Sequence, residues 1–273
     1  MTTEAQPAEE ALWVILRPLK DSSDAAPSGV PKGTIGALIA ALGSPDPALR
    51  DDLAVSTLVR WIVMDRQLSD DVLHDLHARA RSADGALYLL GERDTTSVFR
   101  RSFSLLLLAL LHAADNATPY LQSQEWEGTV ETLERVGMEE LDLRATVPGM
   151  GWAHAIAHAA DLADELARSQ HCTSETGARI LAALGGLIDR LDHPFLGEED
   201  DRVSMALAAL TANKHISIPD VRKVAGAADG NCMELPGARR TNWKAVARSL
   251  FFRLENVSDR EEAEQLQGDL TAV

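Results

Sequence analysis

The sequence has few aromatic residues, only two cysteines and no run of alternating strand-forming residues. Phe, Trp and Tyr make up 4% of the 273 residues, so Ala and Leu supply most of the apolar surface. Two thiols, Cys172 and Cys232, are too few for a disulfide framework in a chain of this length, and we interpret them as free thiols of a cytoplasmic protein. Val, Ile, Thr and Tyr never alternate with polar residues over the length of a strand, so we expect no β-sheet.

Positive charge is also scarce. The chain carries 26 Lys and Arg against 42 Asp and Glu, which gives a net charge of −16. This balance argues against a general nucleic-acid surface and against docking on anionic lipid. Residues 1–6 lack the basic and apolar regions of a signal peptide. The strongly apolar stretch at residues 103–114 is too short, at about 12 residues, to span a bilayer, so we expect a buried helix and no membrane span.

Helical signals fill most of the chain. Residues 42–54, Leu-Gly-Ser-Pro-Asp-Pro-Ala-Leu-Arg-Asp-Asp-Leu-Ala, resemble the turn and second helix of a HEAT repeat, and residues 198–202 open another such helix. We therefore predict an all-α, HEAT-like helical repeat, in which antiparallel helix pairs stack into an α-solenoid. We expect a disordered or loosely packed segment at 1–33, a single domain at 34–257 and a charged C-terminal helix or tail at 258–273.

Caps and apolar spacing predict the positions of the individual helices. The predicted ranges are 34–42, 47–65, 69–81, 95–113, 118–133 with a break near Ser123, 149–168, 173–191, 198–210, a short helix from 218, 243–254 and a last helix from 258. Gly177, Gly185 and Gly186 fall inside one of these helices and indicate close packing against a neighbour.

The stretch from Gly149 to Arg168 carries a polar stripe. The high content of Ala, Leu and Glu favours a helix, and Gly149 and Gly151 allow a tight turn at its start. At about 100° per residue, one side of this helix gathers Trp152, Ala155, Ala159, Leu162 and Leu166. The opposite side gathers His154, His158, Asp161 and Glu165.

Three interpretations of this stripe stay open. His154 and His158, spaced four residues apart, can both reach one metal ion, as in helical zinc motifs. His154 and Asp161 lie about 10 Å apart along the helix axis, so another element must supply the further ligands. Without a metal, Asp161 can fix the tautomer of His158 and leave that imidazole as a general base. The stripe can also be simply a solvated face, because no HExxH motif is present.

A second polar group lies on the apolar helix predicted from Thr95 or Thr96 to Ala113. Arg101, His112 and Asp115 share one side of this helix or of its continuation. They are either the polar ends of a core helix or side chains that line the same cavity as His154 and His158.

Three strings in the sequence resemble a bacterial family described only as domain of unknown function 2785. They are Arg101-Ser-Phe-Ser104 with the leucines after it, Gly151-Trp-Ala-His-Ala-Ile-Ala-His-Ala-Ala-Asp161, and Gly197-Glu-Glu-Asp-Asp-Arg202. The resemblance covers about residues 38–254. It implies an α-helical, HEAT-like fold, and it implies no activity.

Two functions from different classes fit these residues. As a binding module, the protein would hold an unidentified protein or small-molecule ligand in a concave groove contacted by Trp152, His154, His158 and Asp161, and its acidity would favour basic partners. As an enzyme, it would be a metal-assisted or His-based hydrolase, with His154 and His158 as ligands or bases and Asp161 as the orienting group. The remaining shell would then come from Arg101, His112, Asp115 or Glu165. A purely structural scaffold is a third possibility, and no cofactor follows from these residues.

Overall fold

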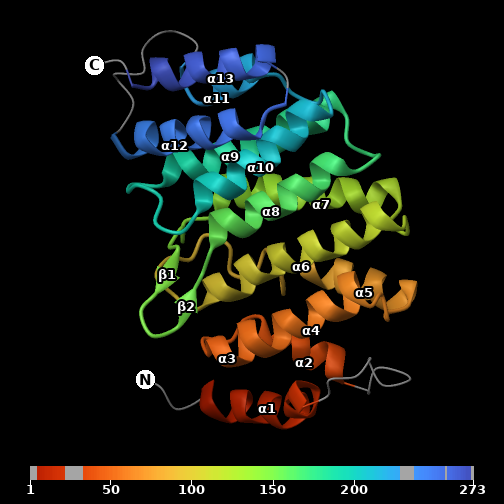
Figure 1. The fold of residues 1–273 in the computed structure, drawn as a ribbon. Coiled ribbons are helices and arrows are strands. Elements are labelled where there is room, and N and C mark those ends of the chain that lie inside the picture. The colour runs from red at the N-terminus through yellow and green to blue at the C-terminus, as the bar shows by residue number, and fades with distance from the viewer. Residues whose placement is uncertain (1–4, 22–32, 228–236, 256, 272–273) are drawn as a thin grey trace.

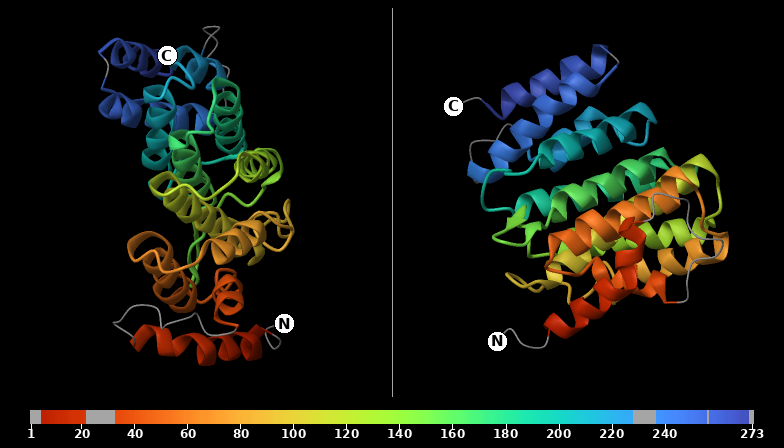
Figure 2. Two further views of the ribbon diagram at one scale, coloured as in Figure 1. Left: turned by 90° about the vertical axis from the view of Figure 1, so that its right-hand side faces the viewer. Right: turned by 60° about the horizontal axis from the view of Figure 1, so that its bottom comes forward.

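Helices follow one another along nearly the whole chain in the computed structural model, which describes residues 5–21, 33–227, 237–255 and 257–271. The fold is all-α, as the composition predicts. The helices stack in successive layers from α1 at one end of the molecule to α13 at the other (Figure 1). Figure 2 shows the same succession of layers from two further directions.

The N-terminal layers begin with α1 (Ala5–Asp21) and α2 (Thr34–Ala41). Residues 47–64 then form one continuous helical stretch in which α-helical and π-helical turns alternate: α3 (Pro47–Leu49), η1 (Arg50–Val55), α4 (Ser56–Val59) and η2 (Arg60–Met64). Its start follows from the sequence, because the Asp46 carboxylate accepts a 2.9 Å hydrogen bond from the Ala48 amide and Pro47 occupies the first turn. The short helix α5 (Asp70–Ala80) completes this part.

The central layers contain α6 (Ser97–Ala117), α7 (Ser123–Glu139), α8 (Ala155–Arg168) and α9 (Ser174–Arg190). Helix α6 packs on α8, and α7 packs on α9. Between α7 and α8 lies a small antiparallel hairpin of two-residue strands, β1 (Thr146–Val147) and β2 (Gly151–Trp152). We expected no sheet, and this hairpin escaped the analysis because two residues are too few to show an alternating pattern.

The C-terminal layers contain α10 (Glu199–Ala212), α11 (Ile218–Val224), α12 (Gly237–Arg253) and α13 (Val257–Asp269). Helix α10 packs between α8 and α12, and α13 packs on α12 and α11. The last helix is therefore part of the stack, with Ala263, Leu266 and Leu270 buried.

Part of the N-terminal segment forms a helix, one of the two alternatives, with an extended lead-in, that the sequence leaves open for residues 11–19. Of residues 1–33, which we expected to be disordered or loosely packed, residues 5–21 form α1, and Leu16 is completely buried beneath the second layer. Apolar residues at helical spacing, Leu12, Trp13, Leu16 and Leu19, give this helix a face to pack with. Residues 1–4 and 22–32 lie outside the described part, as does Cys232, and the three-segment division stays a prediction.

Helix α6 lies at the centre of the core. It is long and apolar enough to cross a membrane by length and composition alone, but 78% of its most apolar window is buried inside the protein. Its two long sides contact α5 and α8. The apolar stretch is thus a core helix, which agrees with the prediction, while the cytoplasmic location stays a prediction.

Glycines bring α7 and α9 into close contact. A Cβ atom at Gly186 would lie 2.6 Å from the backbone oxygen of Gly137, and one at Gly137 would lie 2.6 Å from the Cα atom of Ala183. Gly177 and Gly185 also have no room for a side chain, because His215 and Val224 lie against them. These contacts agree with the close packing predicted from the glycines of this helix.

Candidate functional site

The hairpin places Trp152 and His154 ahead of helix α8. Gly149 and Gly151 adopt positive φ angles of 76° and 81°, which L side chains rarely adopt. After the turn, the amides of Ala153 and His154 both donate to the carbonyl of Ala145, and His154 itself has a left-handed φ of 51°. Helix α8 therefore begins only at Ala155, and the predicted start near Gly149 was wrong: hairpin hydrogen bonds hold this backbone instead of helical ones.

Arg50 holds the hairpin in place. Its guanidinium is completely buried and donates hydrogen bonds to the carbonyls of Met150, at 2.9 Å, and Trp152, at 3.3 Å. The same group stacks over the rings of Phe99 and Phe103 on α6, 4.1 Å and 4.7 Å from their centroids. The second layer is thereby tied to both the hairpin and α6.

Trp152 and His154 form a stacked pair. Their rings are parallel within 5°, with centroids 4.3 Å apart, and Trp152 remains 46% exposed. The sequence pattern placed these residues on opposite faces of one helix, which was wrong because neither lies in the helix. Gly197 closes over the pair: a Cβ atom there would lie 2.9 Å from Cζ3 of Trp152 and 3.3 Å from Cε1 of His154.

His158 is held by Ser102 of α6. The Ser102 hydroxyl donates to the carbonyl of Ala153 and lies 2.8 Å from Nδ1 of His158. A carbonyl can only accept, so the single hydroxyl proton points to Ala153 and Nδ1 must carry the proton that it shares with Ser102. The other ring nitrogen, Nε2, is then a bare acceptor. It makes no hydrogen bond with the described residues, and it is not among the fully buried polar atoms that lack a partner, so water can reach it.

Both imidazoles of the site are neutral near pH 7. Burial lowers the pKa of His158 to about 3, and the neighbouring His154 lowers it further. Burial also lowers the pKa of His154 to about 4, with a smaller contribution from Arg202. The ring centroids lie 5.5 Å apart, and Nδ1 of His154 is buried without a partner. His158 is only 7% exposed, so its ring does not belong to a solvated face.

Asp161 faces α10 rather than His158. Its carboxylate accepts a 3.1 Å hydrogen bond from Arg202. Burial raises the pKa of Asp161, while Arg202 lowers it. The group that fixes the tautomer of His158 is thus Ser102, and the role predicted for Asp161 was wrong because the helix turns its carboxylate toward the next layer. Glu165, one turn further on, accepts from the Asn116 side chain at 2.9 Å, and burial raises its pKa.

The three strings noted in the sequence meet at this site. The first supplies Ser102, the second supplies residues 152–161, and the third supplies Gly197 and Arg202, which contact the second from α10 and the turn before it. Residues 87–252 match the family model described as protein of unknown function (DUF2785). The chain belongs to this family. No curated protein and no solved structure matches it.

The matched region also contains Arg101, His112 and Asp115, which do not contact His154 or His158. Arg101 is 1% exposed and its guanidinium bonds both carboxylate oxygens of Glu140. His112 bonds the Thr129 hydroxyl at 3.1 Å, and Asp115 accepts from the amides of residues 120 and 121. These three residues are polar parts of the core, which is the first of the two interpretations drawn from the sequence.

Several residues of the site escaped the sequence analysis. Ser102, Gly197 and Arg202 lie inside the strings that carried the family resemblance, so a search for polar residues within those strings would have found them. Arg50 gave no such signal. Arginine in a helix is usually exposed to solvent, so its burial against aromatic rings of another helix is not predicted from the sequence.

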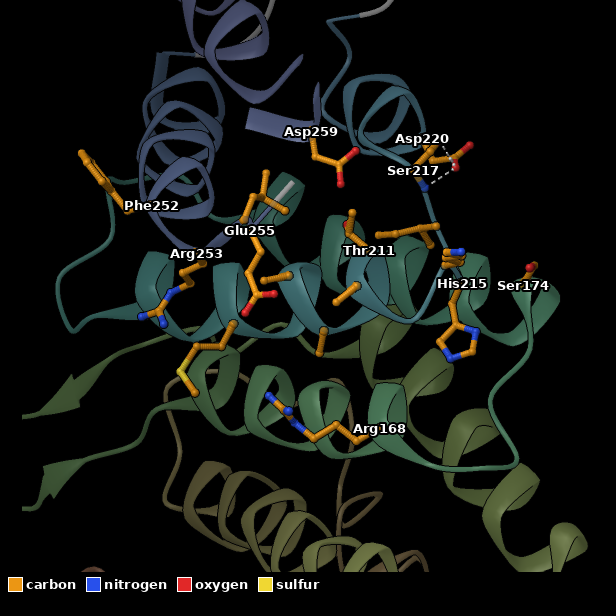
Figure 3. A pocket seen from close by; sticks show the side chains of 17 residues that line it. Arg168, Ser174, Thr211, His215, Ser217, Asp220, Phe252, Arg253, Glu255 and Asp259 are labelled. Atoms are coloured by element: carbon orange, nitrogen blue, oxygen red, sulfur yellow. Dashed lines mark hydrogen bonds between the residues drawn. The ribbon is translucent and has the colours of Figure 1, made fainter. Parts of the chain in front are cut away.

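Metal ligands and cavities complete the description of the site. No group of three or more His, Cys, Asp or Glu that could hold a metal occurs in the described ranges. Hollows of about 990, 290 and 180 Å³ are lined by described residues, and His154 and His158 line none of these three. The largest lies at the other end of α8, near Arg168 (Figure 3).

Proposed function

We propose that this protein is a binding module that holds a small molecule against Trp152, His154 and His158. The observation that carries the proposal is the bare Nε2 acceptor of His158, a nine-tenths buried side chain held in one tautomer by Ser102. Nε2 is an accessible acceptor on an otherwise buried ring, so a ligand that donates a hydrogen bond can replace the water there. The half-exposed indole of Trp152 offers such a ligand a flat apolar contact.

The chemistry of the site defines the class of ligand. His158 presents an acceptor, so the ligand carries an N–H or O–H donor. Both imidazoles are neutral near pH 7, so the site does not select for negative charge. The Asp161–Arg202 pair, which lies beside the imidazoles, is already neutralised internally. We therefore infer a neutral or cationic donor, such as an amine or an alcohol attached to a flat ring.

The runner-up function is a metal-assisted or His-based hydrolase. A general base works best with a pKa near the working pH, whereas the pKa of His158 is about 3. Such an imidazole accepts hydrogen bonds readily and protons poorly, which favours binding over proton transfer. Neutral imidazoles do suit a transition metal, but the described residues supply His154 and His158 and no third protein ligand beside them.

The helix stack supports the same proposal. Its layers fit a HEAT-like array, and arrays of this kind hold ligands on surfaces formed by successive layers. The proposed site draws on such layers, because its residues come from α6, the hairpin, α8 and α10.

Thermal shift on the full chain tests the proposal. The probes are a panel of aromatic amines and alcohols together with ZnCl₂ and CoCl₂. A ligand present at about one hundred times its Kd adds about 2.7 kcal/mol of stability. For a chain of this size, that raises Tm by about 5–10 °C.

Three variants locate the binding. Trp152→Ala, at an exposed position, and His158→Ala should each abolish the shift, while His74→Ala on α5 should keep it. If no probe shifts the wild type, or if probes shift both site variants as much as the wild type, the binding proposal fails. A shift by the metal salts alone, lost in His154→Ala and His158→Ala, would support the metal alternative instead.

A further inference from the structure

The hollow of about 990 Å³ is the largest of the three described above, and it lies away from the imidazoles. We call it the α10 groove: a hollow of about 990 Å³ between the exposed face of α10, the end of α8, and the chain around the end of α12 (Figure 3). Arg168, at its α8 edge, follows His158 by ten residues, which is about 15 Å along the helix. The groove can therefore be altered without touching the imidazole site.

The floor of the groove is a stripe of small and flexible apolar side chains on α10. Met205, Ala208, Ala209 and Ala212 are spaced so that they share one face of the helix. The other faces of α10 are covered by α8 and α12, whereas on this face Ala212 is exposed, Met205 and Ala208 are half-buried and Ala209 is buried. Short side chains allow another helix to approach closely, and Met adapts to the shape of its partner.

One edge of the groove exposes an aromatic residue. Phe252, near the end of α12, is 77% exposed, and Ile216 and Leu254 also line the groove. Exposed aromatic side chains beside an apolar floor are typical anchors of protein interfaces. The groove therefore offers an apolar contact along the second half of α10 and a large anchor at one end.

The charges of the groove favour a basic partner. Its two arginines are already paired within the protein, Arg168 with Asp164 at 2.8 Å and Arg253 with Asp201. Burial lowers the pKa of His215, so this residue adds no positive charge at pH 7.

Two carboxylates at the groove, Glu255 and Asp259, make no ion pair with the described residues. A third, Asp220, has its pKa lowered by hydrogen bonds from Ser217 and by the nearby Lys223. Lys214 also lines the groove. Figure 3 shows Asp220 and Asp259 on the side of the groove opposite Arg168. Because Asp164 and Asp201 neutralise Arg168 and Arg253, Glu255 and Asp259 leave a small negative charge at the groove, of the same sign as the net charge of −16.

We propose that the α10 groove docks an amphipathic helix of a partner protein that carries Lys or Arg beside its apolar face. The apolar face would lie on Ala208, Ala209 and Ala212, and its basic residues would meet Glu255 and Asp259. This is the helix-in-groove mode of recognition, in which residues spaced three and four apart anchor the helix. The proposal does not rest on the ligand proposed for the imidazoles.

The test uses fluorescence anisotropy with the full chain and labelled synthetic peptides. The main probe is a helical peptide of about 18 residues, or about 27 Å, with Leu on one face and Lys on the flanks. A second peptide replaces each Lys by Glu, and a third has the composition of the first in an order that destroys the apolar face. At about 150 mM salt, where long-range attraction is screened, we expect only the first peptide to bind.

Variants of the protein then place the binding in the groove. The double variant Glu255→Lys/Asp259→Lys should weaken binding of the basic peptide at least about tenfold, which is about 1.4 kcal/mol. Asp84→Lys/Glu131→Lys makes the same change of net charge at two exposed positions elsewhere and should weaken it less than about twofold. Ala212→Trp, which fills the floor without changing charge at an exposed position, should also weaken binding at least about tenfold.

Circular dichroism confirms that each variant keeps its helices before its affinity is compared. The proposal is overturned if the acidic or the rearranged peptide binds as well as the basic amphipathic one. It is equally overturned if both groove variants bind the basic peptide like the wild type. Because His158→Ala leaves the groove unchanged, loss of small-molecule binding in that variant, with peptide binding retained, separates the two proposals.

Discussion

The Ser102 hydroxyl lies between the Ala153 carbonyl and Nδ1 of His158, and this position decides which nitrogen of the imidazole carries the proton. ¹⁵N NMR of the imidazoles should therefore show His158 as the neutral Nδ1–H tautomer from pH 7 down to about pH 5, since its pKa is about 3. In Ser102→Ala the Nδ1–H loses its partner, which should cost about 1–3 kcal/mol in urea unfolding. A ring that titrates near pH 6.5, or one protonated on Nε2, would contradict the assignment.

Buried imidazoles should make the protein less stable in mild acid. Burial lowers the pKa of both His77 and His112 to about 3. Arg81 contributes to both shifts, and His112 contributes to that of His77. The unfolded chain has pKa values near 6.5, so between pH 6.5 and 3 it binds more protons than the folded chain, and the free energy of unfolding falls as pH falls. Each such group contributes up to about 1.4 kcal/mol per pH unit.

Urea unfolding at pH 7, 6 and 5 measures this slope. His112→Leu should reduce it by the contribution of one group. Val130→Ala, at a buried position on α7, removes no titrating group, so it should lower stability by the same amount at each pH. Burial raises the pKa of Asp161 and Glu165, and these acids oppose the slope equally in both variants. Parallel pH profiles for wild type and His112→Leu would show that His112 does not titrate with a lowered pKa.

Gly197 should control the position of Trp152 more than the stability of the fold. In Gly197→Ala the new Cβ would lie 2.9 Å from Cζ3 of Trp152, and the half-exposed indole can move aside. We expect a change of about 0.5 kcal/mol or less in the free energy of unfolding, together with a clear change in near-UV circular dichroism and weaker binding at the imidazoles. The spectral change should vanish in a Trp152→Phe background. Gly36→Ala, which meets no atom within 4 Å, is the matched control.

Sequence reasoning placed most of the helices, did not commit to α1 and missed the turns between the helices. Caps at Asp46 and Thr173 and the apolar spacing of α6 are local signals, and the structure follows them. The start of α8 was predicted wrongly because Gly149 and Gly151 belong to a hairpin, and its first strand lies several residues earlier in the chain. His154 and His158 do lie together, but through a left-handed residue and a stacked indole rather than through helical periodicity. Contacts between layers, such as that of Ser102 with His158, leave no local periodicity to read.

Arg101 should prove essential for stability and dispensable for binding. Its guanidinium meets both oxygens of Glu140 with both side chains almost fully buried, so Arg101→Met leaves an unpaired buried carboxylate and should cost about 3–5 kcal/mol. Arg101→Met/Glu140→Gln removes that charge and should recover a large part of the loss, because the amide oxygen of Gln can still accept from the backbone amides of residues 141 and 142. If Arg101 served to bind a ligand instead, adding Glu140→Gln would not recover what Arg101→Met loses. Arg179→Met, which breaks more exposed pairs with Glu127 and Glu134, should cost about 1 kcal/mol or less. Urea unfolding of the wild type and the three variants measures these changes in the free energy of unfolding. A loss below about 1 kcal/mol in Arg101→Met, or no recovery in the double variant, would mean that the buried pair does not hold α6 to the end of α7.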